Sequence, residues 1–290
     1  MNNPLYRPPA EAYSLILQVE RGCPYNKCTF CGMYRGLKYQ RLAMGEIQKL
    51  IEQESKLDPN ARRIFLADGD VMRRPFDELV EILTMLNDNF PRLARVSLYA
   101  SGSAITSKSA EQMRILRSLK LHTLYMGLES GDDQILKNCN KGETATKMVQ
   151  AGIMAQENGL RMSVMILLGL GGADHSNEHA ENTAKALNQM QPRLLSALRV
   201  VPVEGTELYD DTLTGRFKML SEHGIVEEIR QIIGGLDMQS TVFRANHGSN
   251  VIPLEGRLPK DNARLLAELD TLIASNVLDS KSPGRMPIQL

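Results

Sequence analysis

Three of the four cysteines lie within nine residues of one another. Cys23, Cys28 and Cys31 belong to the segment GCPYNKCTFCG, whereas Cys139 stands alone. Thiolates are soft ligands that bind zinc, copper(I) or iron–sulfur clusters. A group of three in a chain that is otherwise poor in cysteine therefore predicts a metal or cluster site.

The spacing leaves three interpretations of this site open. A [4Fe–4S] cluster normally takes four cysteines, so three of them would leave one iron available to another ligand, and we favour this interpretation. A closed zinc site takes four ligands, often as two cysteine pairs, and the sequence holds no second pair. Zinc completed by a histidine or by Cys139, and buried structural thiols, stay open. We expect Cys139 to be a packed thiol.

Apolar runs of strand length alternate with segments of helical period as far as Gly235. Such alternation is typical of parallel strands joined by right-handed helical crossovers. A complete barrel has eight such units in about 250 residues, whereas we count six, so the expected fold class is α/β, an open (β/α)6 partial TIM barrel with a short C-terminal extension. The predicted strands are Tyr13–Val19, Arg63–Ala67, Arg95–Ala100, His122–Leu128, Met162–Leu168 and Leu195–Val201.

Beyond the barrel the pattern weakens. Residues 236–258 are predicted as loop or irregular strand, and a helix is predicted over Ala263–Ala274. The expected organisation is an N-terminal lead-in over 1–12, the barrel core over 13–235, an extension over 236–275 and a flexible tail over 276–290.

Composition excludes several classes of protein. Lys plus Arg and Asp plus Glu number 34 each, and zero formal charge argues against a nucleic-acid partner held by non-specific phosphate contacts. The longest apolar runs, such as Val164–Leu168, have the length of strands, whereas a membrane span needs about 20 apolar residues. The segment Met1–Tyr13 carries no signal-type sequence. We expect a cytoplasmic protein without a membrane partner.

Two acidic motifs follow predicted strands, where α/β barrels carry their functional loops. Asp68-Gly69-Asp70 follows the second strand, and Gly127-Leu-Glu-Ser-Gly131 ends the fourth. The cysteine segment follows the first strand in the same way. We expect these three segments to lie at the carboxyl ends of their strands.

On these three segments, in this order, the sequence resembles the radical S-adenosylmethionine (SAM) superfamily over residues 13–235. The third segment, continued by Asn140-Lys141-Gly142, is similar to the branch of the Elongator catalytic subunit, the methylthiotransferases and the oxygen-independent coproporphyrinogen dehydrogenases. The sequence departs from the family in one respect: four residues, where three are common, separate Cys23 from Cys28.

The resemblance implies a [4Fe–4S] cluster and SAM as cofactors. Cys23, Cys28 and Cys31 would hold three irons, and SAM would chelate the fourth. One electron would then cleave SAM to methionine and a 5′-deoxyadenosyl radical, which abstracts hydrogen from a substrate that we expect to be a small molecule. An electron donor such as flavodoxin or ferredoxin is the expected partner.

The resemblance also implies which residues bind SAM. Phe30 would pack near the adenine, and Asp68, Gly69 and Asp70 would meet the SAM ammonium group. Glu129 would reach polar groups of SAM, because a carboxylate accepts hydrogen bonds from hydroxyl or ammonium groups. Gly169, in the turn over 169–172, would let the backbone approach the adenosine. We assign no catalytic residue beyond these ligands.

Other functions remain as alternatives. One is an enzyme like the coproporphyrinogen dehydrogenases that acts on a tetrapyrrole. Another is a non-catalytic sensor that binds SAM or an iron–sulfur cluster without cleaving SAM. A zinc-binding structural protein is the third.

Several polar residues have two interpretations. His175 and His179 are four residues apart at a helix start, and we interpret them as a solvated helix face rather than a metal pair. The segment Arg244–Asn250 either faces a ligand or forms a turn that satisfies its own backbone. Arg199 and Glu204, near the end of the sixth strand, are candidates for substrate contacts.

Overall fold

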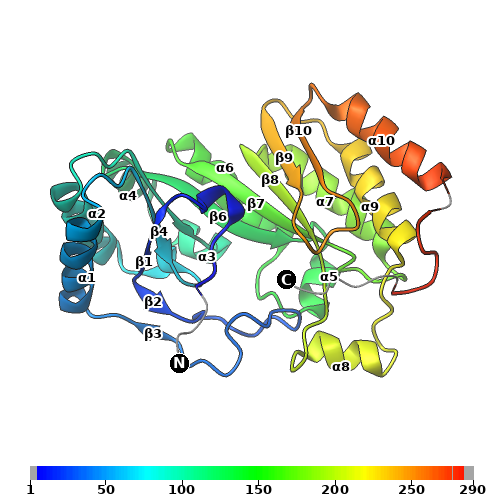
Figure 1. The fold of residues 1–290 in the computed structure, drawn as a ribbon, viewed down its shortest axis with the longest axis horizontal. Helices are drawn as coiled ribbons and strands as arrows, with labels where there is room; N and C mark the ends of the chain where they lie inside the picture. Colours follow the sequence, from blue (N-terminus) through cyan, green and yellow to red (C-terminus); the bar gives the residue numbers. More distant parts are fainter. Residues whose placement is uncertain (1–4, 276, 284–290) are drawn as a thin grey trace. The chain divides into compact units, whose positions relative to one another are not determined.

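The computed structural model describes residues 5–275 and 277–283 (Figure 1). Its strands form a mainly parallel sheet with the order β1-β4-β5-β6-β7-β8-β9-β10, and a separate two-stranded ribbon pairs β2 with β3. The sheet does not close, since β1 and β10 end the order. The predicted fold class, an open α/β partial barrel, is confirmed.

The chain forms two compact units. Unit 1 consists of Met1–Asn26, Met33–Met126 and Ala151–Met162, and unit 2 consists of Lys27–Gly32, Gly127–Gln150 and Ser163–Leu290. Each unit is described by itself below. Of the expected flexible tail, residue 276 and residues 284–290 lie outside the described residues, as do residues 1–4 of the expected lead-in.

Unit 1 is built on strands of which β4 is the most completely buried. In the second of its four sheet strands, RIFLA, every residue after Arg63 is buried, as expected for a parallel strand covered on both faces. The strands are β1 (Leu15–Gln18), β4 (Arg63–Ala67), β5 (Arg95–Tyr99) and β6 (Leu121–Glu129, whose last three residues belong to unit 2), with β2 (Glu20–Arg21) and β3 (Gln40–Arg41) in the ribbon.

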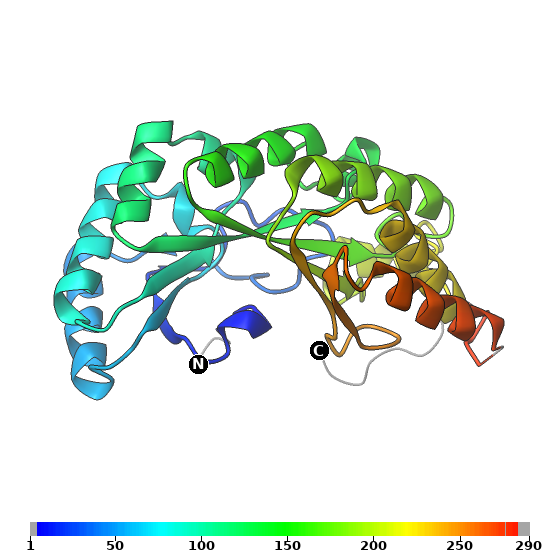
Figure 2. The same cartoon turned by 90° about the horizontal axis from the view of Figure 1, so that it is seen from above.

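The helices of unit 1 cover one face of these strands, and the short helix η1 lies on the other (Figure 2). In α2, Leu79, Ile82, Leu83 and Leu86 are buried at helical spacing and form its apolar stripe. Ser109 caps α4 by accepting the Gln112 N–H, which fixes the start of that helix. The elements are η1 (Pro9–Glu11), α1 (Met44–Leu57), η2 (Val71–Arg73), α2 (Phe76–Asn89), α3 (Gly102–Thr106) and α4 (Ala110–Ser118).

In unit 2 the long helices lie along one face of the strands (Figures 1 and 2). α7 and α9 pack against each other, and α9 also packs against α10. The strands are β7 (Arg161–Leu168), β8 (Leu194–Arg199), β9 (Thr241–Ala245) and β10 (Leu254–Leu258). The helices are α5 (Asp133–Asn138), α6 (Ala145–Glu157, continuing into unit 1), α7 (Ser176–Met190), α8 (Glu207–Leu213), α9 (Glu222–Gly235) and α10 (Asn262–Ala274).

The region 236–258 contains more regular structure than predicted. β9 pairs parallel with β8, and β10 returns antiparallel to β9. In β9 the buried residues Thr241, Phe243 and Ala245 alternate with Val242 and Arg244. A five-residue strand that contains an arginine gives only a short signal in the sequence, and its pairing with β8 completes it.

No helix in the described part of the chain is long and apolar enough to cross a lipid bilayer.

Candidate functional site

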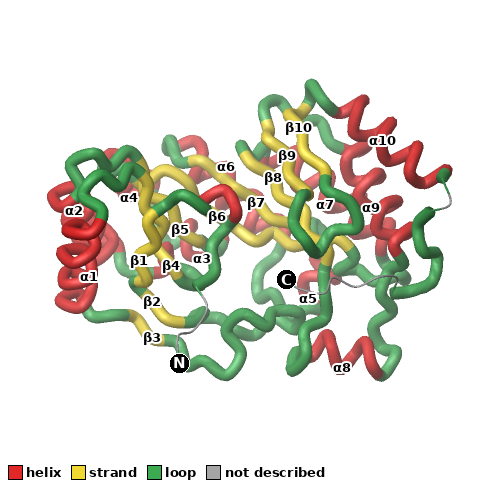
Figure 3. The backbone as a smooth tube through the Cα atoms, in the orientation of Figure 1, coloured by secondary structure: helices red, strands yellow, loops and turns green. Residues whose placement is uncertain are grey.

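The three clustered cysteines lie on an irregular segment. Between β2 and β3, residues 22–39 form neither helix nor strand (Figure 3). Cys23, Cys28 and Cys31 are all partly exposed, and none forms a disulfide. The Asn26 N–H points at the Cys23 sulfur at 3.5 Å. Partly exposed thiols on a loop, one of them facing a backbone N–H, suit ligands of an iron–sulfur cluster, whose sulfurs commonly accept such hydrogen bonds.

In unit 1 the turn after β4 packs directly against the first cysteine. The Gly69 N–H donates to the Gly22 carbonyl at 3.3 Å. A Cβ atom on residue 69 would lie 2.6 Å from the Cys23 Cα, so only glycine fits at this position. The middle residue of the Asp68-Gly69-Asp70 motif therefore sets how closely this turn approaches the cysteine loop.

Asp68 is buried and accepts hydrogen bonds from neutral donors. Its carboxylate takes the Gln18 Nε2 at 2.9 Å, the Gly22 N–H at 3.3 Å and the Tyr34 hydroxyl at 3.3 Å. Burial raises the pKa of Asp68 above its ordinary value, and these hydrogen bonds oppose that shift. This carboxylate thus ties the turn to β1 and to the cysteine loop.

Asp70 holds the next strand in a similar way. Its carboxylate accepts the Ser101 N–H at 3.0 Å, the Ser101 hydroxyl at 2.6 Å and the Arg73 Nε at 3.3 Å. Burial raises its pKa as well, against the hydrogen bonds from Ser101 and the charge of Arg73. Both acidic side chains of the motif are therefore engaged within unit 1.

In unit 2, Cys28 and Cys31 belong to a stretch held by backbone contacts. The Thr29 N–H donates to the Cys139 carbonyl, and the Leu208 N–H donates to the Thr29 carbonyl, both at 3.0 Å. The Cys31 N–H donates to the Cys28 carbonyl at 3.2 Å. The α5 end and the α8 start therefore fix this stretch from two sides.

Phe30 packs into an apolar cluster of unit 2, and Cys139 is a member of that cluster. The cluster consists of Ile135, Cys139, Leu170, Val200 and Leu208, with Phe30, Leu167 and Phe217 packed against it. Cys139 is 5% exposed, and burial raises the pKa of its thiol to about 12. It is the packed thiol expected from the sequence.

Glu129 ends β6 in a strained conformation and carries a cationic partner. Its φ is 62°, in the left-handed region that L residues seldom adopt, and its side chain lies 2.9 Å from the Lys141 Nζ. A Cβ atom on Gly127 would lie 2.9 Å from the Glu129 Cδ and 3.2 Å from the Lys141 Nζ. Burial acts to lower the pKa of Lys141, but the Glu129 carboxylate, Cys28 and Glu143 together outweigh it and the pKa is raised.

Lys141 is the residue that sequence reasoning missed here. The segment Asn140-Lys141-Gly142 belongs to the resemblance, which assigns no role to the charge of the lysine. The available signal is a lysine twelve positions after a candidate acidic ligand. The pairing itself needs the turn between β6 and α6, which the sequence pattern does not describe.

Gly169 follows β7 with a φ of 80°, as a turn glycine should. Its N–H donates to the Glu228 Oε1 at 2.6 Å, and a Cβ atom there would lie 2.8 Å from the Ile225 Cδ1. Burial raises the pKa of Glu228 above its ordinary value. The turn is thus held by a buried acid on α9 that the sequence did not reveal.

The interpretation of His175 and His179 as a solvated face is wrong for one of them. His175 is exposed at the start of α7, but His179 is fully buried. The reason is that α7 turns this side chain toward Ser130 and α9, so that the histidine faces the protein interior rather than solvent.

The weaker candidates separate into buried and exposed groups. Arg199 is 3% exposed and donates to the Pro283 carbonyl at 2.5 Å, whereas Glu204 is exposed.

Within the segment Arg244–Asn250, the Asn250 Nδ2 donates to the carbonyls of Ala245 and Ala197 at 2.8 and 2.9 Å. These bonds favour the interpretation of a turn that satisfies backbone groups.

An open, mainly parallel α/β sheet with a cysteine-bearing loop after its first strand defines the class of protein. The family model of the radical SAM superfamily matches residues 17–185, which is more than half of the chain. The chain therefore belongs to the radical SAM superfamily.

A curated relative is an uncharacterized methyltransferase from Pyrococcus horikoshii. It is 24% identical over 202 residues, which are 67% of this chain and 41% of the relative. The chain thus spans well under half the length of that relative.

Two solved structures have a similar fold. Coproporphyrinogen III oxidase from Escherichia coli gives a TM-score of 0.58 at 15% identity, covering 76% of this chain and 51% of that one. The Elp3 protein of Methanocaldococcus infernus gives 0.53 at 15% identity, covering 92% and 64%. Both belong to groups named in the sequence resemblance, and at these identities the likeness is one of fold.

Proposed function

We propose that this protein is a radical SAM enzyme whose Cys23, Cys28 and Cys31 hold a [4Fe–4S] cluster. When bound, the cluster and SAM supply a 5′-deoxyadenosyl radical that abstracts hydrogen from a substrate. The observation that carries the proposal is the contrast among the cysteines: three are partly exposed on one loop inside the family match, and the fourth is buried in an apolar cluster.

The chain's own residues would bind and orient SAM. Gly69 places the turn after β4 against Cys23, and the carboxylates of Asp68 and Asp70 hold that turn. The backbone carbonyls of Asp68 and Gly69 would then meet the SAM ammonium group. Glu129 and Lys141 offer an acceptor and a cation side by side. Such a pair matches a ligand that carries hydroxyls and a carboxylate.

The substrate class and the reductant are argued separately. We propose a small-molecule substrate, because the chain has zero formal charge and so lacks the excess of basic residues that favours nucleic acids. The one-electron cleavage of SAM needs a donor, and we propose one of the flavodoxin or ferredoxin kind.

The experiment compares Cys23→Ala, Cys28→Ala and Cys31→Ala with the matched control Cys139→Ala, each reconstituted anaerobically. We expect the first three to lose bound iron and acid-labile sulfide and the control to keep both. Wild-type protein should form 5′-deoxyadenosine from SAM and dithionite. Wild-type protein that contains zinc and no acid-labile sulfide would contradict the proposal. Wild-type protein that carries a cluster but forms no 5′-deoxyadenosine would instead indicate the alternative of a non-catalytic sensor.

A further inference from the structure

Two helices of unit 2 carry a buried polar network that none of the assigned roles uses. His179 on α7 is fully buried, and Glu228 on α9 is 1% exposed. The His179 Nδ1 lies 2.8 Å from the Ser130 Oγ, and its Nε2 lies 3.7 Å from the Glu228 Oε1. The histidine therefore stands between a residue next to Glu129 and an acid of another helix.

The neighbouring bonds allow one arrangement of protons that satisfies both residues. The Ser130 Oγ accepts the Asp132 N–H at 3.0 Å, and its hydroxyl proton can be donated to the His179 Nδ1. In that arrangement the Nε2 carries the ring proton and points toward Glu228. Among the described residues the Nε2 has no partner within hydrogen-bonding distance, and the Glu228 carboxylate is the group it faces.

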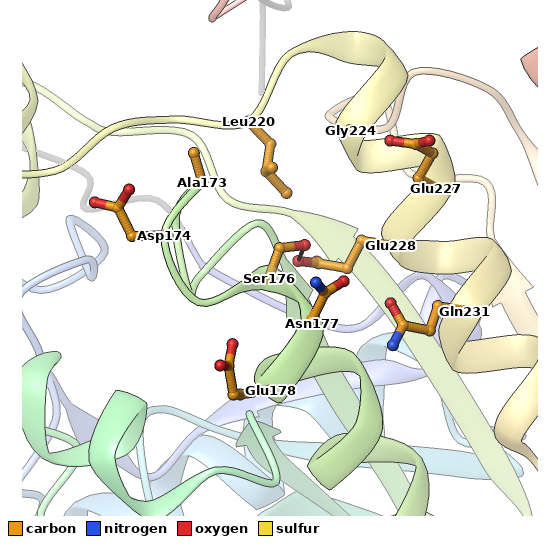
Figure 4. A pocket seen from close by; sticks show the side chains of 10 residues that line it. All are labelled: Ala173, Asp174, Ser176, Asn177, Glu178, Leu220, Gly224, Glu227, Glu228 and Gln231. Atoms are coloured by element: carbon orange, nitrogen blue, oxygen red, sulfur yellow. Dashed lines mark hydrogen bonds between the residues drawn. The ribbon is translucent and has the colours of Figure 1, made fainter.

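Glu228 connects the network to the turn after β7. Its Oε1 accepts the Gly169 N–H at 2.6 Å, and its Oε2 accepts the Ser176 hydroxyl at 2.5 Å. Figure 4 shows the Ser176 and Glu228 side chains in contact with each other, where both line a pocket between α7 and α9. A carboxyl group buried to this degree is stable only where it is hydrogen-bonded, so these bonds fix the position of the turn.

The same helix α7 clamps the turn after β6 at its next two residues. The Gly131 N–H donates to the Thr183 Oγ1 at 2.9 Å, and the Asn182 Nδ2 donates to the Asp132 Oδ2 at 2.7 Å. A Cβ atom on Gly131 would lie 2.5 Å from the Thr183 Cα, so helix and turn are in direct contact. A positive φ at Glu129 persists only where the surroundings enforce it, and these contacts hold the two residues that follow Ser130.

We propose that His179 is a positioning residue that couples the turn bearing Glu129 to the turn bearing Gly169, through Ser130 on one side and Glu228 on the other. The inference rests on the proposed function, since it assigns the coupled turns to the binding of SAM. His179 acts through its neighbours, and its removal should loosen both turns together.

The test uses His179→Ala and His179→Asn. Asparagine places an amide where the Nδ1 stands and so keeps the bond to Ser130 while it loses the reach to Glu228. The matched control is Thr241→Val, which removes a buried hydrogen bond of 2.6 Å to the Pro192 carbonyl in the same unit, at the amino end of β9. Two quantities are measured: the SAM dissociation constant of the reconstituted protein, and amide hydrogen exchange over 125–135 and 166–174 without SAM.

We expect His179→Ala to weaken SAM binding about tenfold and to speed exchange in both segments, with iron content unchanged. His179→Asn should recover slow exchange over 125–135 but not over 166–174. Thr241→Val should change neither measurement, even where it lowers the melting temperature. If His179→Ala does not fold, His179→Asn alone tests the inference, because exchange should stay slow over 125–135 and become faster over 166–174.

The failures are distinguishable. Unchanged SAM binding and exchange in the His179 variants, beside a wild type that binds and cleaves SAM, would overturn this inference alone. An equal loss of SAM binding in Thr241→Val would also overturn it, because general destabilisation would then explain the effect. A wild type that carries a full cluster and binds no SAM would overturn the proposed function and this inference with it.

Discussion

The turn after β4 and the turn after β6 both carry acidic candidate ligands, but the surroundings of these acidic side chains differ. Asp68 and Asp70 are surrounded mainly by neutral donors that belong to neighbouring segments. Glu129 has a strained backbone and a lysine as its partner. A buried acid bonded to backbone and hydroxyl groups holds the chain in place, whereas strain beside an ion pair is typical of residues that meet a ligand.

Substitutions at Gly69 and Gly127 should have the largest effects, because each glycine lies in or beside one of the two turns. Gly69→Ala would place a Cβ atom 2.6 Å from the Cys23 Cα, where backbone must move. We expect the variant to lose about tenfold or more of its cluster content, since a displaced first ligand exposes the others. Iron and sulfide analysis after reconstitution checks this. A full cluster in Gly69→Ala would show that this turn does not set the position of Cys23.

Gly127→Ala should act on the other turn without harming the cluster. The added Cβ atom would lie against the Glu129 carboxylate and 3.2 Å from the Lys141 Nζ, and so would displace the ion pair. We expect SAM binding to weaken about tenfold at normal iron content. Lys141→Ala should do the same, and Lys141→Arg should restore part of the affinity. Equal iron loss in Gly69→Ala and Gly127→Ala would remove the distinction between the turns.

The buried Asp70, in the turn after β4, should make the stability of the fold depend on pH. Burial raises the pKa of Asp70 above the ordinary 3.8, so the folded state favours the protonated form. Its contribution to stability is full below about pH 3.8 and is lost as pH rises through the raised pKa. Relative to Asp70→Asn, the wild type should therefore lose melting temperature as pH increases. Thermal melts of cluster-free protein from pH 4 to 8 check this, and a wild-type melting temperature that rises with pH relative to that of Asp70→Asn would contradict it.

The smallest predicted effect concerns a glycine far from either turn in the chain. A Cβ atom on Gly45, inside α1, meets nothing within 4 Å. Gly45→Ala should therefore stabilise the protein by about 0.5–1 kcal/mol through helix propensity alone, with iron content and SAM binding unchanged. It serves as the control for the two other glycine variants, and a loss of cluster in it would make their results uninformative about the turns.

The sequence predicted the parts of the site that are local. The cysteine segment, the Asp68-Gly69-Asp70 turn and Gly169 each follow a strand that the apolar runs had located. The contacts that hold these turns come from far along the chain. Glu228 reaches Gly169 across 59 positions, and His179 reaches Ser130 across 49. A single sequence contains no periodic signal for such pairs, so the buried histidine was interpreted as a surface residue.

The measurement that tests the central claim most directly is EPR of the anaerobically reconstituted, dithionite-reduced protein with and without SAM. The account predicts a reduced [4Fe–4S] signal whose g-values move when SAM is added, because three cysteines leave one iron open to it. A cluster signal that is indifferent to SAM, or no cluster signal at all, would contradict it.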